Sequence, residues 1–525
     1  MTRLIAAAGP QGSVRAGGAV RAAAYVALAV LAFLARLLPV LRGGGLLGLG
    51  VYDDGVYYAG AAALVAGRVP YADFVLLHPP GVVLALSPFA LLGRLTSDPT
   101  GYAVARLALM ALGAANTVLV ALLARRFGWV AAAVSGVFYA IWFPATYWEA
   151  RTTIEPWGTT LTLGALLLLL PRAERTERNA REEQAGQPRG PATRRATARA
   201  TVLAGVLLGL TVGLKIWSVA PLAVIVLWHL VAVGRAATMR LVAGVAAGAA
   251  VVWLPFLAAA PGPMLRMVVA DQLGRPRMGI TNGGRLGSIL NLTPHFAHVP
   301  SGLKLVVLGV VLLVVLAAAV AAWSRKDARV VVLLLLTTTV VVLAGPSYFR
   351  HYSSFPAPFL AVVVGVAVAV VLAGATRRVA AAGTAAVLVV VALAAVTPMT
   401  RRLNVSFPGA QLGHLAAGKG CVVADDPSAL ILMGVLSRDL ARGCPQPVDF
   451  SGATYDVASE RGPGGQPVPR GRNGRWQRYA VQQLTAGSMT VLARLDQDGF
   501  DRATVRRLQA LPEVASVDGY VLRGR

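Results

Sequence analysis

Length, composition and charge place this chain in a membrane. It has 525 residues, of which 56% are hydrophobic and 14% charged, and its mean hydropathy is +0.65. A soluble protein of this composition would lack the polar side chains needed to cover its surface. A net charge of +26 would suggest nucleic-acid binding in a soluble chain, but most of the arginines lie in short loops between apolar runs, where they set topology. We therefore expect a multi-pass membrane protein and no nucleic-acid partner.

Long apolar segments predict a mainly α, polytopic transmembrane helical bundle over residues 1–397. A span needs about 20 apolar residues. On this criterion we expect about eleven spans, at 23–41, 101–124, 128–147, 156–171, 200–214, 219–234, 241–259, 304–323, 329–345, 355–374 and 379–397. The apolar segment 82–93 is shorter and follows Pro79-Pro80. We interpret it as a helix that lies at the membrane interface or re-enters the membrane.

Basic loops predict the orientation of this bundle. Arginine and lysine gather before the first predicted span and in every second loop thereafter, including eight arginines between Arg172 and Arg199. By the positive-inside rule that side is the cytoplasm. The N-terminus is then cytoplasmic, and 42–100, 260–303 and the tail face outward. The loop 172–199 is polar and rich in both charges, which predicts a disordered cytoplasmic linker.

The tail, residues 398–525, has a different character from the bundle. Apolar runs of strand length, CVVADD and MTVLARL, occur with a helix-length run, SALILMGVLS, and a turn-rich stretch, RGPGGQPVPRGRNGR. This pattern predicts a small α/β domain outside the cytoplasm. Cys421 and Cys444 are the two cysteines of the chain, and a disulfide between them could persist in an oxidising compartment. Two unpaired thiols remain the alternative, because sequence does not give their distance.

Titratable residues gather in short loops on the predicted outer face. They are Asp53, Asp54, His78, Glu149, Arg151, Glu155, Lys215, Arg350 and His351. Carboxylates at this depth are costly unless they are paired or hydrated, so this face is the candidate for chemistry. Each group also has a structural interpretation. Asp53 or Asp54 could cap a helix over 56–67, Glu155 could cap the helix that begins at Pro156, and Arg151 could pair with Glu149 or Glu155.

Several motifs then follow one another in a distinctive order. They are YDDGVYYAGAAALVAGRVPYADF, HPPG, ARTTIEPWGTTLTLGALLLLL and GLTVGLKIWSVAPL within residues 20–235, and SYFRHYSSFPAPFL at 347–360. This order resembles the GT-C class of polytopic glycosyltransferases, and within it the branch of protein O-mannosyltransferases and the lipid A aminoarabinose transferase. The resemblance implies transfer of a sugar, mannose or arabinose among the candidates, from a polyprenyl-phosphate carrier. The acceptor would be a hydroxyl of an envelope glycan, lipid or protein outside the membrane.

The resemblance also implies roles for particular residues. The acidic residue of the family's first outer loop falls on Asp53 or Asp54, with Asp53 preferred, and the second acidic position falls on Glu155. Lys215 matches the lysine of a short turn and would meet the carrier phosphate. Related transferases often have lysine before the Pro-Pro pair, where this chain has His78, which puts a phosphate-binding role there in question.

Physical chemistry agrees with these roles. Attack on the anomeric carbon needs a base, alignment of the reactants and positive charge opposite the departing phosphate. Asp53 would take the proton, while Lys215, Arg350 and Arg151 would stabilise the phosphate, and a single displacement would invert the anomeric centre. Alternatively, Asp53, Asp54 and Glu155 could hold a divalent cation that bridges the phosphate.

Two other functions compete with a transferase. A transporter or flippase for a lipid or lipid-linked sugar should place charges in mid-span or in broken helices near the bilayer centre. In this chain the acidic residues gather at outer helix ends, which favours an enzyme. An envelope-assembly protein without catalysis would keep its function when Asp53 is replaced.

Overall fold

The structure is a computed structural model. It describes residues 10–374 except 171–190, 276–279 and 294–298, then 376, 378, 379 and 381–385, and finally 400–524 except 496–498. The larger part of the predicted linker 172–199 and of the predicted span 379–397 therefore lies outside the described residues.

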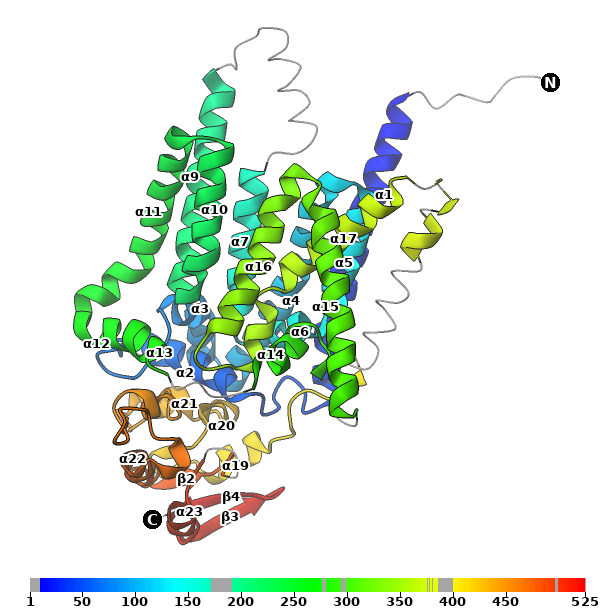
Figure 1. Ribbon diagram of the computed structural model, residues 1–525. Helices are drawn as coiled ribbons and strands as arrows, with labels where there is room; N and C mark the ends of the chain where they lie inside the picture. Colours follow the sequence, from blue (N-terminus) through cyan, green and yellow to red (C-terminus); the bar gives the residue numbers. More distant parts are fainter. Residues whose placement is uncertain are drawn as a thin grey trace, which may run out of the picture.

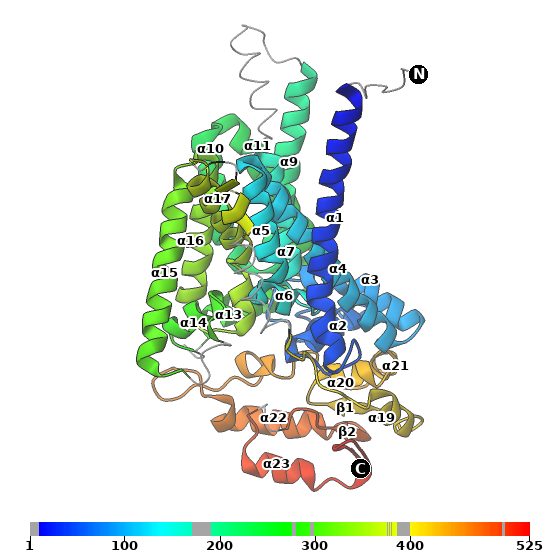
Figure 2. The same cartoon turned by 90° about the vertical axis from the view of Figure 1, so that its right-hand side faces the viewer.

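Long apolar helices run side by side through the upper part of the molecule (Figures 1 and 2). Their bounds are α1 Pro10–Arg42, α4 Asp98–Ala124, α9 Pro191–Leu214, α11 Arg235–Ala259, α15 Ser301–Trp323, α16 Arg329–Ala344 and α17 Ala357–Leu372. With the 3₁₀ turns that precede them, α16 and α17 extend to spans of 19 and 23 residues, Lys326–Ala344 and Arg350–Leu372. Seven described helices are long and apolar enough to cross a membrane. The number rises to eight if α5 (Trp129–Ile141) and α6 (Phe143–Glu149), which meet at a 56° bend, form one span.

Two of the predicted spans are shorter in the structure than a membrane requires. They are α7 (Glu155–Leu169) with 15 residues and α10 (Val219–Ala232) with 14, against the roughly 20 of a full span. The segment 82–93 lies in α3 (Gly81–Leu95), another short apolar helix. The polytopic helical bundle that the hydropathy predicts is confirmed, with seven or eight full-length candidates among the described residues.

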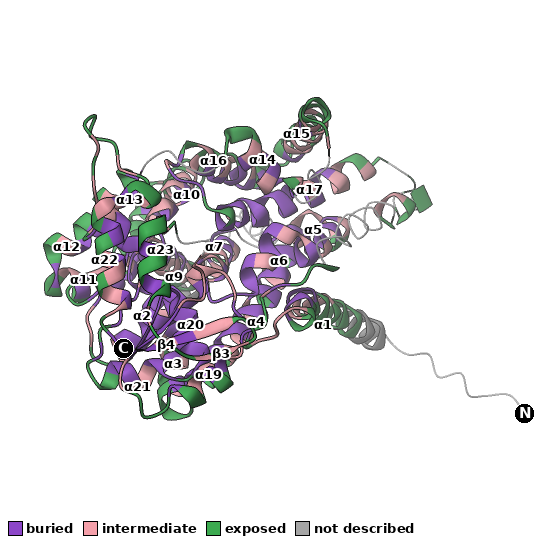
Figure 3. Ribbon diagram, turned by 90° about the horizontal axis from the view of Figure 1, so that it is seen from below, coloured by how far each residue is buried: buried purple, intermediate pink, exposed green. Residues whose placement is uncertain are grey.

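The burial of the helices sorts them into inner and outer positions. Seen from the end that carries the tail, α5, α6 and α17 are largely buried, whereas α1 and α15 are exposed along much of their length (Figure 3). The exposed residues of α15 are apolar, for example Leu305, Val314 and Val320. An apolar surface of this extent is typical of a helix that faces lipid.

The C-terminal region lies against the lower end of the bundle in Figure 1 and contains a four-stranded sheet of order β1-β2-β4-β3. The strands are β1 Val422–Ala424, β2 Met489–Val491, β3 Glu513–Val517 and β4 Tyr520–Gly524. Strands β1 and β2 are parallel, and the other pairs are antiparallel. The helices of the C-terminal region are α19 Gly409–Leu415, α20 Pro427–Leu432, α21 Leu436–Ala441, α22 Gly474–Leu484 and α23 Arg502–Gln509.

Particular elements of this region follow the predicted pattern. The runs CVVADD and MTVLARL contain β1 and β2, while SALILMGVLS is split into α20 and the start of α21 at Gly434, whose φ is +68°. Few residues other than glycine adopt that backbone conformation, so the helix breaks there. A disulfide joins Cys421 to Cys444, and it resolves the two alternatives in favour of pairing.

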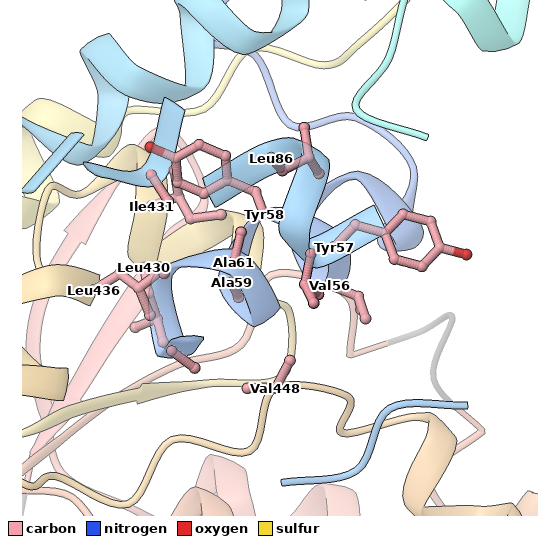
Figure 4. Packing of buried hydrophobic residues seen from close by; sticks show 14 of the residues in the cluster. Val56, Tyr57, Tyr58, Ala59, Ala61, Leu86, Leu430, Ile431, Leu436 and Val448 are labelled. Atoms are coloured by element: carbon pink, nitrogen blue, oxygen red, sulfur yellow. The ribbon is translucent and has the colours of Figure 1, made fainter. Parts of the chain in front are cut away.

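Helix α2 (Tyr52–Val65) joins the bundle to the C-terminal region. Figure 4 shows its side chains packed against Leu86 of α3 on one side and against Leu430, Ile431, Leu436 and Val448 on the other. Gly55 permits this approach, because a Cβ at that position would collide with Ser428. Ten of the 14 residues of α2 are buried, so the helix is held from both sides and the direction of its polar residues is fixed.

Candidate active site

A cavity of about 390 Å³ lies where α2 meets the C-terminal region. Its walls come from the first turns of α2, the loop before α3, the end of α6, the loop before α17 and three segments of the C-terminal region. The ionisable groups of the walls are Asp53, His78, Arg275, Arg350, His351, Asp449, Arg470 and Arg494. Acidic and strongly basic side chains therefore face the same space.

Asp53 is the carboxylate of the pair that faces this cavity. Its side chain is 35% exposed and its Oδ2 lies 3.4 Å from Nδ1 of His351. Burial among the surrounding protein atoms raises the pKa of Asp53 to about 7, and the nearby carboxylates of Asp449 and Glu155 act in the same direction. A carboxyl group with a pKa near neutral is well matched to general base catalysis.

Asp54 points away from the cavity into a buried ion pair. Its Oδ2 lies 2.8 Å from Nη2 of Arg106 on α4, with both side chains fully buried. The backbone N–H of Thr152 donates to its Oδ1 at 2.7 Å, and the Thr152 hydroxyl donates to the same oxygen at 2.9 Å. The two adjacent acids thus have different surroundings, and Asp54 ties α2 to α4 and to the loop after α6.

The helix-cap interpretation of these acids is wrong. The N-cap of α2 is Val51, and Asp53 and Asp54 lie within the first turn. Likewise, Ile154 is the N-cap of α7 and Glu155 is its first helical residue. Negative charge in the first turn still favours the helix, because it faces the positive end of the helix dipole.

Glu155 lies beside Lys215, on the other side of the His351 ring from Asp53. Nζ of Lys215 donates to Oε1 of Glu155 at 2.9 Å, and Nε2 of His351 is 3.9 Å from the same oxygen. The imidazole therefore lies between the carboxylates of Asp53 and Glu155. The ammonium group of Lys215 also lies over the ring of Tyr352, 4.3 Å from its centroid.

A narrow crevice runs from this ion pair between the helices. It is lined by Glu155 and Lys215 and by mainly apolar residues of α7, α9 and the start of α17, among them Leu163, Leu214 and Phe359. The crevice has a volume of about 30 Å³, with a charged end and mainly apolar walls.

Two other residues predicted to bind the phosphate, Arg350 and His78, both line the cavity but differ in burial and charge. Arg350 is exposed and lines the cavity. His78 also lines it, but burial lowers its pKa well below the ordinary value, and the charges of Lys215 and Arg275 add to that effect. His78 is therefore neutral near pH 7 and contributes hydrogen bonding rather than positive charge.

Arg151 is not part of the cavity wall. It donates to the backbone carbonyl of Tyr147 at 2.7 Å, and its guanidinium lies 3.9 Å from the centroid of the Tyr147 ring. Neither of the carboxylates expected to pair with Arg151 does so, because Glu149 pairs with Arg36 and Glu155 with Lys215.

Glu149 anchors the end of α6 inside the bundle. Besides the ion pair with Arg36, it accepts hydrogen bonds from Asn116 Nδ2 and from the Tyr139 hydroxyl, both at 2.8 Å. The preceding residue, Trp148, lines the cavity and meets the ring of His351 edge-on, 5.4 Å between centroids. This buried network therefore positions one aromatic wall of the cavity.

Sequence reasoning missed four charged residues of the cavity: Arg275, Asp449, Arg470 and Arg494. Arg275 is nine-tenths buried, and its guanidinium lies between the rings of Phe349, 5.6 Å from the centroid, and Tyr455, 4.7 Å away. The other three come from the C-terminal region, more than 390 residues after Asp53 in the chain. No local pattern marks them, because only tertiary packing brings them to the site.

The donor set does not match a divalent-cation site. Within the described part of the chain, no group of three or more His, Cys, Asp or Glu side chains converges in the way that a metal ion requires. Asp54, one of the three proposed ligands, is engaged with Arg106 and Thr152.

Comparison with known proteins identifies the family. The profile of glycosyltransferase family 87 matches residues 76–346, just over half of the chain. The chain belongs to glycosyltransferase family 87. It is a multi-pass membrane glycosyltransferase of GT-C type, as the order of its motifs predicted. No curated protein matches the chain significantly in sequence.

Solved structures share the fold of this family-87 chain across almost its whole length. ArnT from Cupriavidus metallidurans in the apo state has a TM-score of 0.61 at 15% identity, with 97% of this chain and 98% of ArnT covered. The same enzyme bound to undecaprenyl phosphate has a TM-score of 0.57 at 16% identity, with 96% and 97% covered. The oligosaccharyltransferase AglB from Archaeoglobus fulgidus, in complex with an inhibitory peptide and a dolichol-phosphate, has a TM-score of 0.52 at 12% identity, with 89% and 68% covered.

The different environments of the two adjacent acids predict opposite effects on stability. Asp54→Asn leaves the buried guanidinium of Arg106 without its counter-charge, which costs about 3–5 kcal/mol, whereas Asp53→Asn changes a group that faces the cavity. Thermal unfolding of each purified variant in detergent should show a clear loss for Asp54→Asn and little change for Asp53→Asn. Equal stability of Asp54→Asn and the wild type would show that the ion pair does not hold α2.

Proposed function

We propose that this family-87 enzyme transfers a sugar from a polyprenyl-phosphate donor to an acceptor hydroxyl, with Asp53 as the general base and inversion at the anomeric carbon. The observation that carries the proposal is the position of Asp53. Its carboxylate faces a cavity with several arginines in the walls, whereas its neighbour Asp54 is committed to an ion pair. A base and anion-stabilising charge therefore share one space.

Each group has a defined part in the proposed reaction. Asp53 takes the proton of the acceptor hydroxyl as the oxygen forms a bond to the anomeric carbon. The bond from that carbon to the phosphate oxygen breaks, and the lipid phosphate leaves with the electron pair. Positive charge fixed near the departing oxygen stabilises the transition state. Lys215, Arg350 and Arg275 are the cations that we assign to this role.

His351 positions the base in this scheme. Its ring lies between Asp53 and Glu155, with nitrogen–oxygen distances of 3.4 and 3.9 Å, and it is held edge-on against Trp148. An imidazole held in this way limits the rotation of the Asp53 carboxylate and keeps it directed toward the cavity. Glu155 in turn orients Lys215 through the 2.9 Å hydrogen bond, so we assign it a positioning role.

The crevice beside Lys215 supports a lipid-linked donor. Its apolar walls between α7, α9 and α17 end at a cation, which suits a phosphate head on a hydrocarbon chain. The crevice has a volume of only about 30 Å³, so a polyprenyl chain has to separate these helices or run along their outer surface, with its phosphate at Lys215. The similarly folded ArnT has been crystallised with undecaprenyl phosphate, which supports the same class of carrier here. Mannose and arabinose both remain candidate sugars, and a glycan, a lipid or a protein remains the candidate acceptor.

Replacing the proposed base tests this function directly. Asp53→Asn keeps the size of the side chain but cannot take a proton, so transfer should fall by about 100-fold or more. The measurement is transfer of labelled sugar from undecaprenyl-phosphate-linked mannose and arabinose to an envelope-glycan acceptor by the purified full-length protein. Asp518→Asn, in the turn between β3 and β4, is the matched control and should keep full activity.

The outcomes of this assay separate the competing functions. Full turnover by Asp53→Asn would remove this carboxylate from the chemistry. An inactive wild type with every donor would instead favour transport of a lipid-linked sugar, which vesicle flipping assays would then detect.

The raised pKa of Asp53 predicts the pH dependence of the reaction. The base acts in its deprotonated form, and burial raises its pKa to about 7, so kcat/KM should rise with pH up to about 7 and then level off. Below that pH the rate should fall about tenfold per unit, because a single proton blocks the base. A pH–rate profile that stays flat down to pH 5 would contradict the assignment.

We also propose that the catalytic end of the bundle faces away from the cytoplasm, with residues 398–525 as an extracytoplasmic domain. The basic turns lie at the opposite end of the bundle from this region (Figure 1). Arg126 after α4 pairs with Asp327 between α15 and α16, and Arg21 and Arg125 both lie over the ring of Trp129. Basic residues at one end favour the cytoplasm for that end.

The two cysteines allow a direct test of this orientation. Cys444→Ser removes the disulfide and leaves the half-buried Cys421 as the single thiol of the chain. A membrane-impermeant maleimide should label this variant in intact cells and should leave the wild type unlabelled until it is reduced. Labelling only after the membrane is permeabilised would place the C-terminal region in the cytoplasm.

A further inference from the structure

A second cleft, of about 590 Å³, lies next to the active-site cavity. One wall is the loop 68–75 after α2, another is α12 (Pro261–Leu265) with the turn that follows it, and the third is segment 445–449 with α22. In Figure 1, α12 and α22 lie on the same side of the molecule, one above the other. The cleft is therefore formed between the bundle and the C-terminal region.

Asp449 belongs to the walls of both spaces. Its Oδ1 accepts hydrogen bonds from the Tyr52 hydroxyl at 3.3 Å and from the backbone N–H of Gly452 at 2.6 Å. Tyr52 precedes the proposed base Asp53 directly in the chain. A molecule in the cleft that reaches past Asp449 therefore arrives at the reacting side of the cavity.

An ion pair and a hydrogen bond at the rim of the cleft join the helical bundle to the C-terminal region. Arg266, in the turn after α12, pairs with Asp456 at 2.8 Å, and Arg68 donates to the backbone carbonyl of Cys444 at 2.9 Å. These contacts hold the walls at a fixed separation without a ligand. A volume within the range of about 300–1,000 Å³ is typical of preformed sites for small organic ligands.

The lining of the cleft combines aromatic rings with uncharged polar and charged groups. Tyr479 supplies a partly exposed ring, and Gln483 supplies a partly exposed amide that can both donate and accept hydrogen bonds. Tyr71, Phe74 and Gln446 also line the cleft but are buried, and the Gln446 amide donates to the backbone carbonyl of Val422. A sugar ring presents C–H groups on its face and hydroxyl groups around its edge, so it needs both kinds of partner. The described lining residues include no strand of the sheet, whereas an extended peptide commonly binds by adding to a strand edge.

Tyr71 connects this cleft with the catalytic cavity. It has a φ of +70°, a conformation that is strained for a bulky residue and is often found at functional sites. Its hydroxyl donates to the backbone carbonyl of His78 at 2.7 Å, and His78 lines the cavity. The same strained residue thus lines the cleft and, through its hydroxyl, bonds to a residue of the cavity wall.

We propose that this cleft binds the acceptor and that the acceptor is a carbohydrate chain. The inference rests on the proposed function, because it assigns the second substrate of that reaction. The sugar next to the reacting one packs against Tyr479 and bonds to Gln483, and the terminal hydroxyl extends past Asp449 to Asp53. Transfer then follows the step already given, in which the hydroxyl proton passes to Asp53 and the lipid phosphate departs.

Adjacent glutamines of α22 provide a matched test. Gln483 lines the cleft, whereas Gln482 is exposed and does not. With octyl glycosides of mannobiose and arabinobiose as acceptors, Gln483→Ala should raise the acceptor KM about tenfold, as loss of a sugar hydrogen bond would. The KM for the lipid-linked donor should stay within about twofold, and Gln482→Ala should match the wild type in both constants. Tyr479→Phe, which keeps the ring, should retain acceptor binding, and Tyr479→Ala should lose it.

Measuring disaccharide binding in the absence of the lipid-linked donor tests the cleft independently of turnover. Saturation-transfer NMR of the full-length protein with the same disaccharides should show binding in the wild type and in Gln482→Ala, and a weaker signal in Gln483→Ala. Equal binding of the disaccharides by the two glutamine variants would overturn the proposal. Binding of a serine- and threonine-containing peptide in the cleft, without binding of the disaccharides, would also overturn it. Inactivity of the wild type with all donors would overturn the proposed function instead, and the NMR result would still decide the ligand of the cleft.

Discussion

The buried ion pair between Asp54 and Arg106 is the interaction on which the rest of the site depends. It fixes the first turn of α2 against α4, and the two hydrogen bonds from Thr152 add the loop after α6. With Asp54 held inside, its neighbour on the helix must point elsewhere, because adjacent residues of a helix project about 100° apart. Asp53 is thereby directed into the cavity. One carboxylate stabilises the position from which the other is proposed to act.

The C-terminal region supplies part of the wall of the cavity that contains the proposed base. Its Asp449, Arg470 and Arg494 form part of the cavity wall, and Arg494 also pairs with Asp426 and bonds to the carbonyl of Gly50, just before α2. Burial of charged groups at this boundary lowers the local dielectric, which strengthens the charge interactions among them. It also accounts for the raised pKa of Asp53. The region therefore has electrostatic consequences for the chemistry in addition to its own fold.

Two spaces beside the catalytic cavity suit the problem of a transferase with unlike substrates. The crevice beside Lys215 is apolar with a charged end, and the cleft beyond Asp449 is aromatic and polar. A hydrophobic carrier and a hydrophilic acceptor need different surroundings, yet their reacting atoms must meet within bonding distance. A site at the boundary between the bundle and the C-terminal region satisfies both conditions.

The sequence by itself determined the helical bundle, the α/β character of the tail and the family, because hydropathy and motif order are local properties of the chain. It also predicted Asp53, Glu155, Lys215, Arg350 and His351 as members of one face, since each ends an apolar run on the same predicted side. Only the tertiary structure decided which adjacent acid faces the cavity, that Arg151 turns away from it, and that Arg275 and Asp449 join it. Asp54 is held by partners 52 and 98 residues away, and Arg275 and Asp449 come from segments hundreds of residues after Asp53. The direction of a side chain follows from what packs around its helix, and no local pattern encodes that.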